Sequence, residues 1–208
     1  MIYYRVLLIG GSSHSGKTAL ARALSSRLGW VCHSTDRLAR HPGRPWQTPP
    51  RQVPDHVCEH YLSLSANDLV EDVLRHYRNN VWPLAETMIT AHASDSLTDS
   101  LILEGSAILP DIVAALKRPN VAFLWLTASD ELFKERIHRE SQYDGRSSIE
   151  KTMIGKFLER TVLLNKRMTQ DVMRLRLASV DVSQTANLDE LCDRCLIGLE
   201  TQDFRIPV

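Results

Sequence analysis

The fold of this chain is decided by one short stretch, Gly11-Ser12-Ser13-His14-Ser15-Gly16-Lys17-Thr18. It matches the pattern G-x-x-x-x-G-K-[ST], in which the glycines let the backbone curl so that consecutive N–H groups point inward. Those groups, together with the N-terminus of a following helix, bind phosphate oxygens. The sequence therefore predicts a phosphate-binding loop over all eight of these residues.

The neighbours of the loop favour the same interpretation. An unbroken apolar run, residues 5–9, precedes it as a buried strand, and an amphipathic helix is expected over residues 17–28. In this setting Lys17 can bridge the β- and γ-phosphates of ATP, and the Thr18 hydroxyl can ligate Mg²⁺. His14 occupies a variable position of the loop, so we expect it to have no catalytic role.

Strand-like and helical patterns alternate along the rest of the chain, which predicts one doubly wound α/β domain over residues 1–208. We expect a five-stranded parallel sheet with helices on both faces and about seven helices in all. A Pro-rich segment, residues 41–54, is expected to be a surface loop. The expected strands are residues 5–9, 30–34, 101–103, 121–126 and 179–182; helical patterns cover 17–28, 68–78, 83–93, 131–173 with a break at 143–146, and a last helix from 188.

Bulk composition excludes several functions. The 25 basic and 25 acidic residues cancel, so no general electrostatic attraction to nucleic acid or membrane is expected. No run approaches the roughly 18 apolar residues of a membrane span, and the N-terminus does not resemble a signal peptide. Cys192 and Cys195 lie in a helical pattern and are expected to be buried thiols. These features predict a cytoplasmic protein with no nucleic-acid or membrane partner, and they leave open whether it is a monomer or a homodimer.

The loop alone is shared by GTPases, motor ATPases and kinases. A GTPase should contain an Asn-Lys-x-Asp motif that reads the base, and this chain contains none. A motor ATPase usually carries four apolar residues before Asp-Glu, whereas here the third strand ends as Leu101-Ile102-Leu103-Glu104-Gly105. Both features favour a small kinase.

Four motifs together resemble the nucleoside/nucleotide kinase-like group of P-loop kinases. They are the glycine loop, Ser34-Thr35-Asp36, Ile102-Leu103-Glu104-Gly105, and a charged helix with Arg136 and Arg139. Within that group, residues 34–37 and 103–110 are similar to 2-phosphoglycerate kinase-like proteins. The resemblance implies an ATP- and magnesium-dependent phosphotransferase acting on a hydroxyl or phosphate of a small metabolite.

Two carboxylates are expected at strand ends, where ligands bind in open α/β sheets. In kinases of this kind an acid at the position of Asp36 takes the proton from the substrate hydroxyl or holds a magnesium-bound water; the alternative is a helix cap. The resemblance assigns Glu104 to magnesium or substrate, and a salt bridge is the alternative. The base could be either residue.

A charged segment, residues 136–148, is expected to be a helical lid that is mobile without ligand and closes over the phosphates. At least one of Arg136, Arg139 and Arg146 should contact phosphate, with Arg136 preferred. The alternative is a solvated face whose arginines pair with Glu135 and Glu140. Arg160 and Lys166 are weaker candidates on the next helix.

Two further functions remain open. A nucleoside or nucleoside monophosphate kinase would use the same loop, with Trp46 or Tyr61 stacking on a base. A nucleotide-binding regulatory module would bind ATP with little turnover, although the intact Lys17, Thr18 and Asp36 favour an enzyme.

Overall fold

The computed structural model describes residues 3–39, 41–48, 51–95, 97–184 and 187–201. Its centre is a parallel sheet of five strands in the order β2-β3-β1-β4-β5. The sequence predicted this doubly wound parallel sheet, and the prediction is confirmed. The strands are β1 (Val6–Gly11), β2 (Val31–Ser34), β3 (Leu101–Glu104), β4 (Val121–Thr127) and β5 (Ser179–Asp181).

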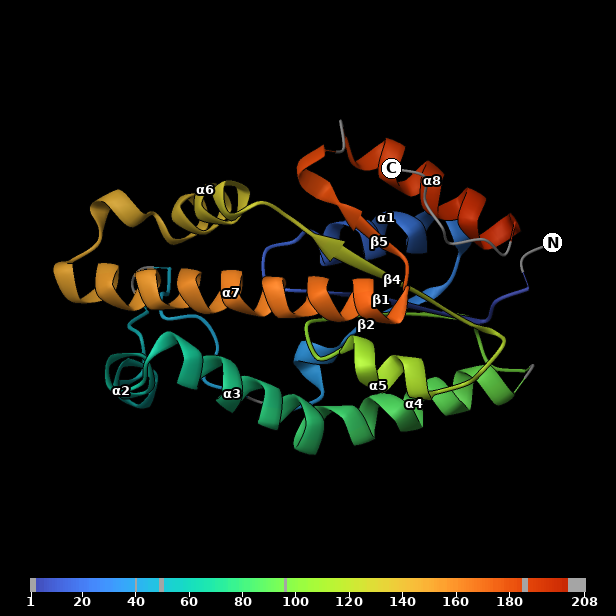
Figure 1. The fold of residues 1–208 in the computed structure, drawn as a ribbon, viewed down its shortest axis with the longest axis horizontal. Helices are drawn as coiled ribbons and strands as arrows, with labels where there is room; N and C mark the ends of the chain where they lie inside the picture. The colour runs from blue at the N-terminus through green and yellow to red at the C-terminus, as the bar shows by residue number, and fades with distance from the viewer. Residues whose placement is uncertain (1–2, 40, 49–50, 96, 185–186, 202–208) are drawn as a thin grey trace.

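Helices cover both faces of the sheet (Figure 1). Helices α1 and α8 pack on one face, and α4, α5 and the end of α7 pack on the other. The α-helices are α1 (Lys17–Leu28), α2 (Asp55–Ser63), α3 (Ala66–His76), α4 (Trp82–Ser94), α5 (Pro110–Ala115), α6 (Asp130–Ser141), α7 (Ser148–Leu175) and α8 (Leu188–Thr201).

Strand β1 shows why its residues form an unbroken apolar run. Leu7 and Ile9 face the core under α1 and α8, whereas Val6 and Leu8 face the core under α4 and α5. Successive side chains of a strand point to opposite faces, so a strand covered on both sides must be apolar at every position. All four side chains are fully buried.

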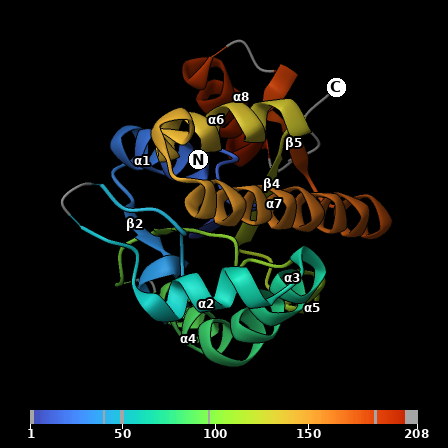
Figure 2. The same cartoon turned by 90° about the vertical axis from the view of Figure 1, so that its left-hand side faces the viewer.

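Beyond the cores on the two faces of the sheet, a third core lies past the carboxyl ends of the strands. There the first half of α7 runs between α6 on one side and α2 and α3 on the other (Figure 2). The aromatic side chains of Trp46, Tyr61, Phe133 and Phe157 fill this core. It places several helices directly over the strand ends, where the sequence predicted the ligand site.

The two helices that follow β4 lie within two residues of the ranges expected from the sequence. The Ser129 hydroxyl accepts a hydrogen bond from the backbone N–H of Leu132 and so caps α6, whose first turn carries two acids. A short 3₁₀ turn, η3 (Tyr143–Gly145), separates α6 from α7. Ser147 and Glu150 then form a capping box at the start of α7. The predicted break at residues 143–146 is confirmed.

The Pro-rich segment differs from the expected surface loop. Its described residues form no helix or strand, as expected, but the side chain of Trp46 is only 7% exposed. The Tyr61 hydroxyl also donates a hydrogen bond to the carbonyl oxygen of Gly43 at 2.6 Å. Directly after this segment lies α2, which the sequence reading missed. The described residues of this segment therefore form a wall of the third core. The described part of the chain has eight α-helices against about seven expected, and α5 as well as α2 falls outside the predicted helical ranges.

Helices α3 and α4 are joined by a π-helical turn, η2 (Tyr77–Val81), instead of a loop. Pro83 lies at the start of α4 and lacks the N–H that would continue regular α-helical bonding. A wider turn before the proline keeps the helix continuous without that bond. Tyr77 and Val81 of this turn line a cavity that is described below.

Cys192 and Cys195 are buried free thiols in α8, as the sequence predicted. Among the described residues, none of the helices has the length and apolar character required to cross a bilayer.

We predict that Gly105→Ala lowers the free energy of unfolding by about 1–3 kcal/mol, as overpacking typically does. Gly105 follows β3 with φ of +154°, and an added Cβ would lie 1.7 Å from Oγ1 of Thr35. Urea unfolding followed by circular dichroism measures the change.

The matched control is Gly155→Ala in α7. An added Cβ there meets no atom within 4 Å. Because alanine favours helix over glycine, this variant should be as stable as the parent or more stable by up to ~1 kcal/mol. Equal stability of the Gly105 variant and the parent would show that Gly105 does not lie against the Thr35 side chain.

Candidate active site

The glycine loop connects β1 to α1, and its backbone requires the glycines. Gly11 has φ of +138°, and an added Cβ would lie 2.4 Å from the carbonyl oxygen of Leu126 on β4. Gly16 has φ of +99° and precedes the first turn of α1. Both conformations are costly for any residue with a Cβ. The glycines of the motif therefore hold the predicted shape.

Two polar side chains of the loop, Ser15 and Lys17, are buried and keep hydrogen-bonding capacity for a ligand. The Ser15 hydroxyl is buried and has no hydrogen-bond partner among the described residues. Lys17 is 7% exposed and donates from Nζ to the carbonyl oxygen of Ser12 at 2.7 Å. An ammonium group has three donors, so this bond leaves donors for a ligand. Ser12 itself donates from Oγ to the carbonyl oxygen of Thr161, which ties the loop to α7.

Two carboxylates act on Lys17. Burial lowers the pKa of its ammonium group, and the negative charges of Glu104 and Asp36 oppose that shift. The two acids come from different strand ends, β3 and the turn after β2. The structure thus places both carboxylates near the loop lysine, as the sequence predicted from the geometry of parallel sheets.

Glu104 accepts a hydrogen bond from the Thr18 hydroxyl, with 3.1 Å between Oγ1 and Oε1. Its side chain is 3% exposed, and the structure shows no salt bridge to it in the described part of the chain. A hydroxyl and a carboxylate oxygen are the hard donors that Mg²⁺ prefers. The pair therefore fits a magnesium ion held beside the loop.

Asp36 lies in a 3₁₀ turn, η1 (Thr35–Arg37), directly after β2. The cap of this turn is Ser34, whose hydroxyl accepts from the backbone N–H of Asp36 at 3.4 Å. The Asp36 carboxylate is exposed and makes no hydrogen bond or ion pair with any described residue. The alternative role as a helix cap thus belongs to Ser34, and the Asp36 side chain is free to act on a ligand.

The predicted site residues meet around one cavity of about 530 Å³, which we call the loop cavity. Its walls come from the glycine loop, the Asp36 turn, the end of β3 and helix α6. Nine residues named from the sequence line it: Ser13, His14, Gly16, Lys17, Thr18, Asp36, Glu104, Arg136 and Arg139. Gly11, Ser12 and Ser15 lie behind the loop surface and are fully buried or nearly so.

A second, smaller cavity of about 190 Å³ adjoins the first, and we call it the Arg160 cavity. Asp36 and Ser106 line both cavities, as do Ser13 and Arg44. Arg160, a weaker candidate from the sequence, reaches this space from α7. The two cavities therefore meet at Asp36.

The three predicted arginines have different environments. Arg136 donates from Nη1 to the carbonyl oxygen of His14 at 2.8 Å and so touches the loop directly. Arg139 is exposed and pairs with Glu135 at 3.0 Å, which is the alternative stated for it. Arg146 does not line the loop cavity; it donates to the carbonyl oxygens of Ser141 and Gln47 instead. Only the first two can reach a phosphate in this arrangement.

The His14 side chain packs against aromatic residues of the third core. Its ring lies 5.9 Å from that of Trp46 and 5.7 Å from that of Phe157, with φ of +65°. Burial lowers the pKa of His14 to about 3, and the positive charges of Arg44 and Lys17 add to the shift. An imidazole with this pKa is neutral and a poor base near pH 7. This agrees with the expectation that His14 has no catalytic role.

Sequence reasoning missed Arg44, which comes from the Pro-rich segment. It lines both cavities, pairs with Glu140 of α6 and lies 6.0 Å from the ring of Trp46. No spacing in the sequence connects residue 44 to the loop, because the contact depends on Trp46 packing into the third core. Arg44 is a candidate phosphate ligand once it is released from Glu140.

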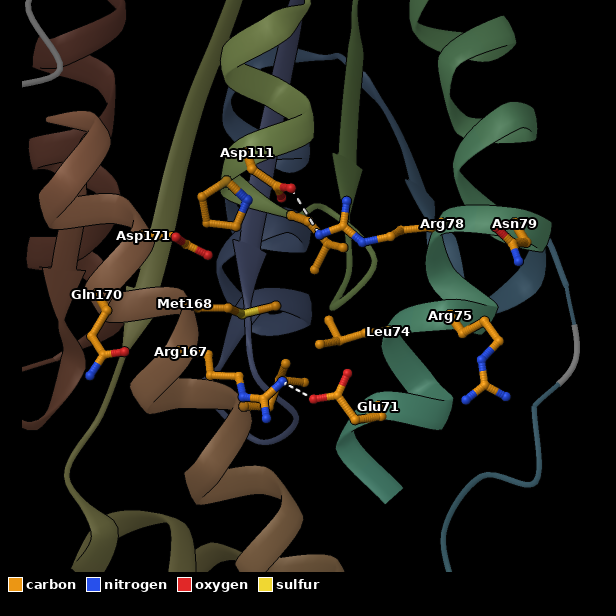
Figure 3. Close-up of a pocket in the computed structure, with 13 residues that line it drawn as sticks. Glu71, Leu74, Arg75, Arg78, Asn79, Asp111, Arg167, Met168, Gln170 and Asp171 are labelled. Carbon is orange, nitrogen blue, oxygen red and sulfur yellow. Dashed lines mark hydrogen bonds and ion pairs between the residues drawn. The ribbon is translucent and has the colours of Figure 1, made fainter. Parts of the chain in front are cut away.

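A third cavity, of about 550 Å³, lies between α3, α5 and α7 and contains none of these residues (Figure 3). Its charged side chains are largely paired with one another. Arg78 donates to Asp111, and Arg167 donates to Glu71 (Figure 3). Because these cations already have carboxylate partners, this cavity offers little to an anionic ligand.

Comparison with known proteins identifies the fold. No protein-family model matches the sequence, and no curated protein sequence matches it. Among solved structures, a gluconokinase from Sinorhizobium meliloti 1021 is similar over 98% of this chain and 95% of its own, with 17% identity and a TM-score of 0.55. A deoxyadenosine kinase from M. mycoides, solved with bound dATP, is similar over 94% of this chain and 99% of its own, with 16% identity and a TM-score of 0.50.

These likenesses confirm the predicted resemblance to P-loop small-molecule kinases at the level of the fold. They do not confirm the finer resemblance to 2-phosphoglycerate kinase-like proteins. The chain has the α/β fold of small-molecule kinases, with its predicted site residues gathered at the carboxyl ends of β1, β2 and β3.

Proposed function

We propose that this protein is an ATP-dependent kinase that transfers the γ-phosphate of ATP to a hydroxyl or phosphate group of a small metabolite. One observation carries the proposal: the loop cavity unites Lys17, the Thr18–Glu104 pair and the unpaired carboxylate of Asp36. A phosphate clamp, a magnesium site and a candidate base are the parts that phosphoryl transfer requires.

The loop residues bind the triphosphate. Backbone N–H groups of the loop and the buried hydroxyl of Ser15 would bind phosphate oxygens, and the Lys17 ammonium group would donate to them. The oxygens of Thr18 and Glu104 would hold Mg²⁺. When bound, ATP with Mg²⁺ supplies the phosphoryl group and neutralises part of its charge.

Asp36 acts on the acceptor. Its carboxylate lies where the two cavities meet, so it can accept a hydrogen bond from an acceptor hydroxyl and take the proton as that oxygen attacks. Arg136 is held beside the loop by the His14 carbonyl and stabilises negative charge on the transferred group. Arg139 adds a second cation when it leaves Glu135.

A nucleoside or nucleoside monophosphate kinase is the second candidate, because one similar structure is a deoxyadenosine kinase. Stacking on a base would need an accessible aromatic face. Trp46 is 7% exposed and Tyr61 is 0% exposed, and both pack inside the third core. This burial favours a compact acceptor that contains no nucleobase. A regulatory module that binds ATP without turnover would not need the free carboxylate of Asp36.

We infer a cytoplasmic location and a monomer or homodimer for this kinase. ATP is abundant in the cytoplasm, and Cys32, Cys58, Cys192 and Cys195 are all unpaired thiols, which suits a reducing compartment.

We further propose that residues 136–148 form the lid. Arg139, Asp144 and Gly145 of this segment are exposed, whereas Ile137 is buried at its base. Closure over the loop cavity would exclude water, which otherwise hydrolyses ATP. Arg136 and Arg139 lie on this segment and would reach the phosphates as it closes.

We predict that amide hydrogen exchange over residues 136–148 slows when an ATP analogue, Mg²⁺ and an acceptor bind. Helix α8, which packs beside α1 and contributes no residue to either cavity, serves as the internal reference and should not change. Strong and equal protection with and without ligands would show a rigid surface helix, and the lid roles of Arg136 and Arg139 would be withdrawn.

We predict that Asp36→Asn lowers the turnover number by roughly 10²-fold or more, as loss of a general base does. Affinity for ATP and the free energy of unfolding should stay near the parent values, because the Asp36 carboxylate has no partner in the described fold. ADP release with a panel of small metabolites measures turnover. Asp189→Asn, an exposed acid in α8, is the matched control and should be unaffected. Normal turnover of the Asp36 variant would move the base role to Glu104.

A further inference from the structure

Arg160 is a buried cation without a counter-charge. Arg160 lies on α7 and is 6% exposed. Its Nε and Nη1 atoms are both buried and have no hydrogen-bond partner among the described residues. The structure shows no ion pair to it in the same part of the chain. A buried charge left unpaired is costly, so such a group in a native protein requires an explanation.

The surroundings of Arg160 hold it in place without neutralising it. Its guanidinium carbon lies 4.7 Å from the ring centre of Phe157 and 5.8 Å from that of Tyr61. Aromatic faces attract a guanidinium but carry no net charge. The two rings therefore orient the side chain and leave its N–H groups for another partner.

Two polar neighbours of Arg160 in the cavity wall, His41 and Tyr77, are neutral, and Arg44 is already paired with Glu140. Burial, followed by the positive charge of Arg160, lowers the pKa of His41 to about 4, so its imidazole is uncharged near pH 7. Burial raises the pKa of Tyr77 to about 12, although Arg160 opposes that shift. The carboxylate of Asp36 stands at the boundary with the loop cavity, and His76 and Ser106 add further polar groups. The cavity thus contains one fixed, unpaired positive charge.

We propose that the Arg160 cavity binds the anionic group, a carboxylate or a phosphate, of the phosphate acceptor. This inference rests on the proposed kinase function. A guanidinium presents parallel N–H donors that match the paired oxygens of either group. With the anion on Arg160, the acceptor extends toward Asp36, where its hydroxyl meets the base.

The size of the cavity narrows the acceptor further. Its volume of about 190 Å³ is below the roughly 300–1,000 Å³ of common ligand pockets. The part of the acceptor that this cavity holds is therefore compact, as in a small hydroxy acid or a small phosphorylated alcohol. The π-helical turn η2 contributes Tyr77 and Val81 to the wall, and turns of this kind are frequent at functional sites.

A metal ion is the competing occupant of this region. His41, His60 and Asp72 offer donor atoms within 4.8 Å of one another, which would suit a divalent cation. Burial lowers the pKa of both His41 and His60, and the positive charge of Arg160 lowers both further, so this charge acts on the cluster. A bound cation would add to a charge that has no partner, whereas an anion removes the imbalance. The charges therefore favour an anion.

The test is calorimetric titration of the full chain with a non-hydrolysable ATP analogue and Mg²⁺ present at saturation, so that the glycine loop is filled. The probes are inorganic phosphate, glycolate and the uncharged ethylene glycol. We expect at least one anion to bind and ethylene glycol not to bind. Binding of phosphate alone indicates a phosphorylated acceptor, and binding of glycolate alone indicates a carboxylic acid.

The variants locate the binding. Arg160→Gln should weaken binding of the anion at least tenfold, and Arg160→Lys should retain part of it because the charge remains. Arg174→Gln, an exposed arginine on the same helix that pairs with Asp171, is the matched control and should bind as the parent does. Affinity for the ATP analogue should be equal in all of these proteins.

Two results would overturn the proposal. One is wild-type protein that binds the ATP analogue but neither anion, a result that does not depend on any variant folding. The other is Zn²⁺ binding that Arg160→Gln strengthens while neither anion binds, which would assign the cluster to a metal. Either result leaves the kinase proposal standing, because that proposal fails only if ATP does not bind or is not turned over.

Discussion

The parallel register of β1 and β3, which pairs Ile9 with Glu104, positions the candidate site. It brings the Glu104 carboxylate from the end of one strand to the Thr18 hydroxyl at the start of the helix after the other. A slip of one residue would turn Glu104 to the opposite face of the sheet, away from the loop. The magnesium site proposed here, and the charge balance of Lys17, both depend on that register.

Buried charge is the second organising feature. Lys17 and Arg160 are both cations below 10% exposure, yet their surroundings differ. Lys17 has Glu104 and Asp36 near it, whereas Arg160 packs against two aromatic rings and forms no ion pair with any described residue. We interpret both as binding groups that await anions, the triphosphate for one and the acceptor for the other. Asp36, unpaired between them, is where the two ligands would meet. On this view, folding leaves charges unsatisfied where ligands bind.

The sequence predicted correctly those features that depend on residues close together in the chain. The glycine loop and the break near Gly145 follow from short-range preferences, and the strand ends placed Glu104 and Asp36 correctly beside the loop. Packing between distant segments could not be predicted in this way. Trp46 draws the Pro-rich segment into the third core and brings Arg44 to the loop. The isolation of Arg160 depends on α2, which the sequence reading missed, and on the turn at Tyr77, so only the structure shows that its charge is unpaired.

The central claim is that the glycine loop binds ATP through Lys17. Calorimetric titration with ATP and Mg²⁺ tests it most directly, comparing the parent, Lys17→Ala and the exposed-site control Lys134→Ala. Because hydrogen bonds to charged groups contribute about 1.5–3 kcal/mol, we expect Lys17→Ala to weaken ATP binding by roughly 10- to 100-fold with the circular dichroism spectrum unchanged. The control should bind as the parent does. Equal affinity of the parent and Lys17→Ala, or no binding by the parent, would contradict the account.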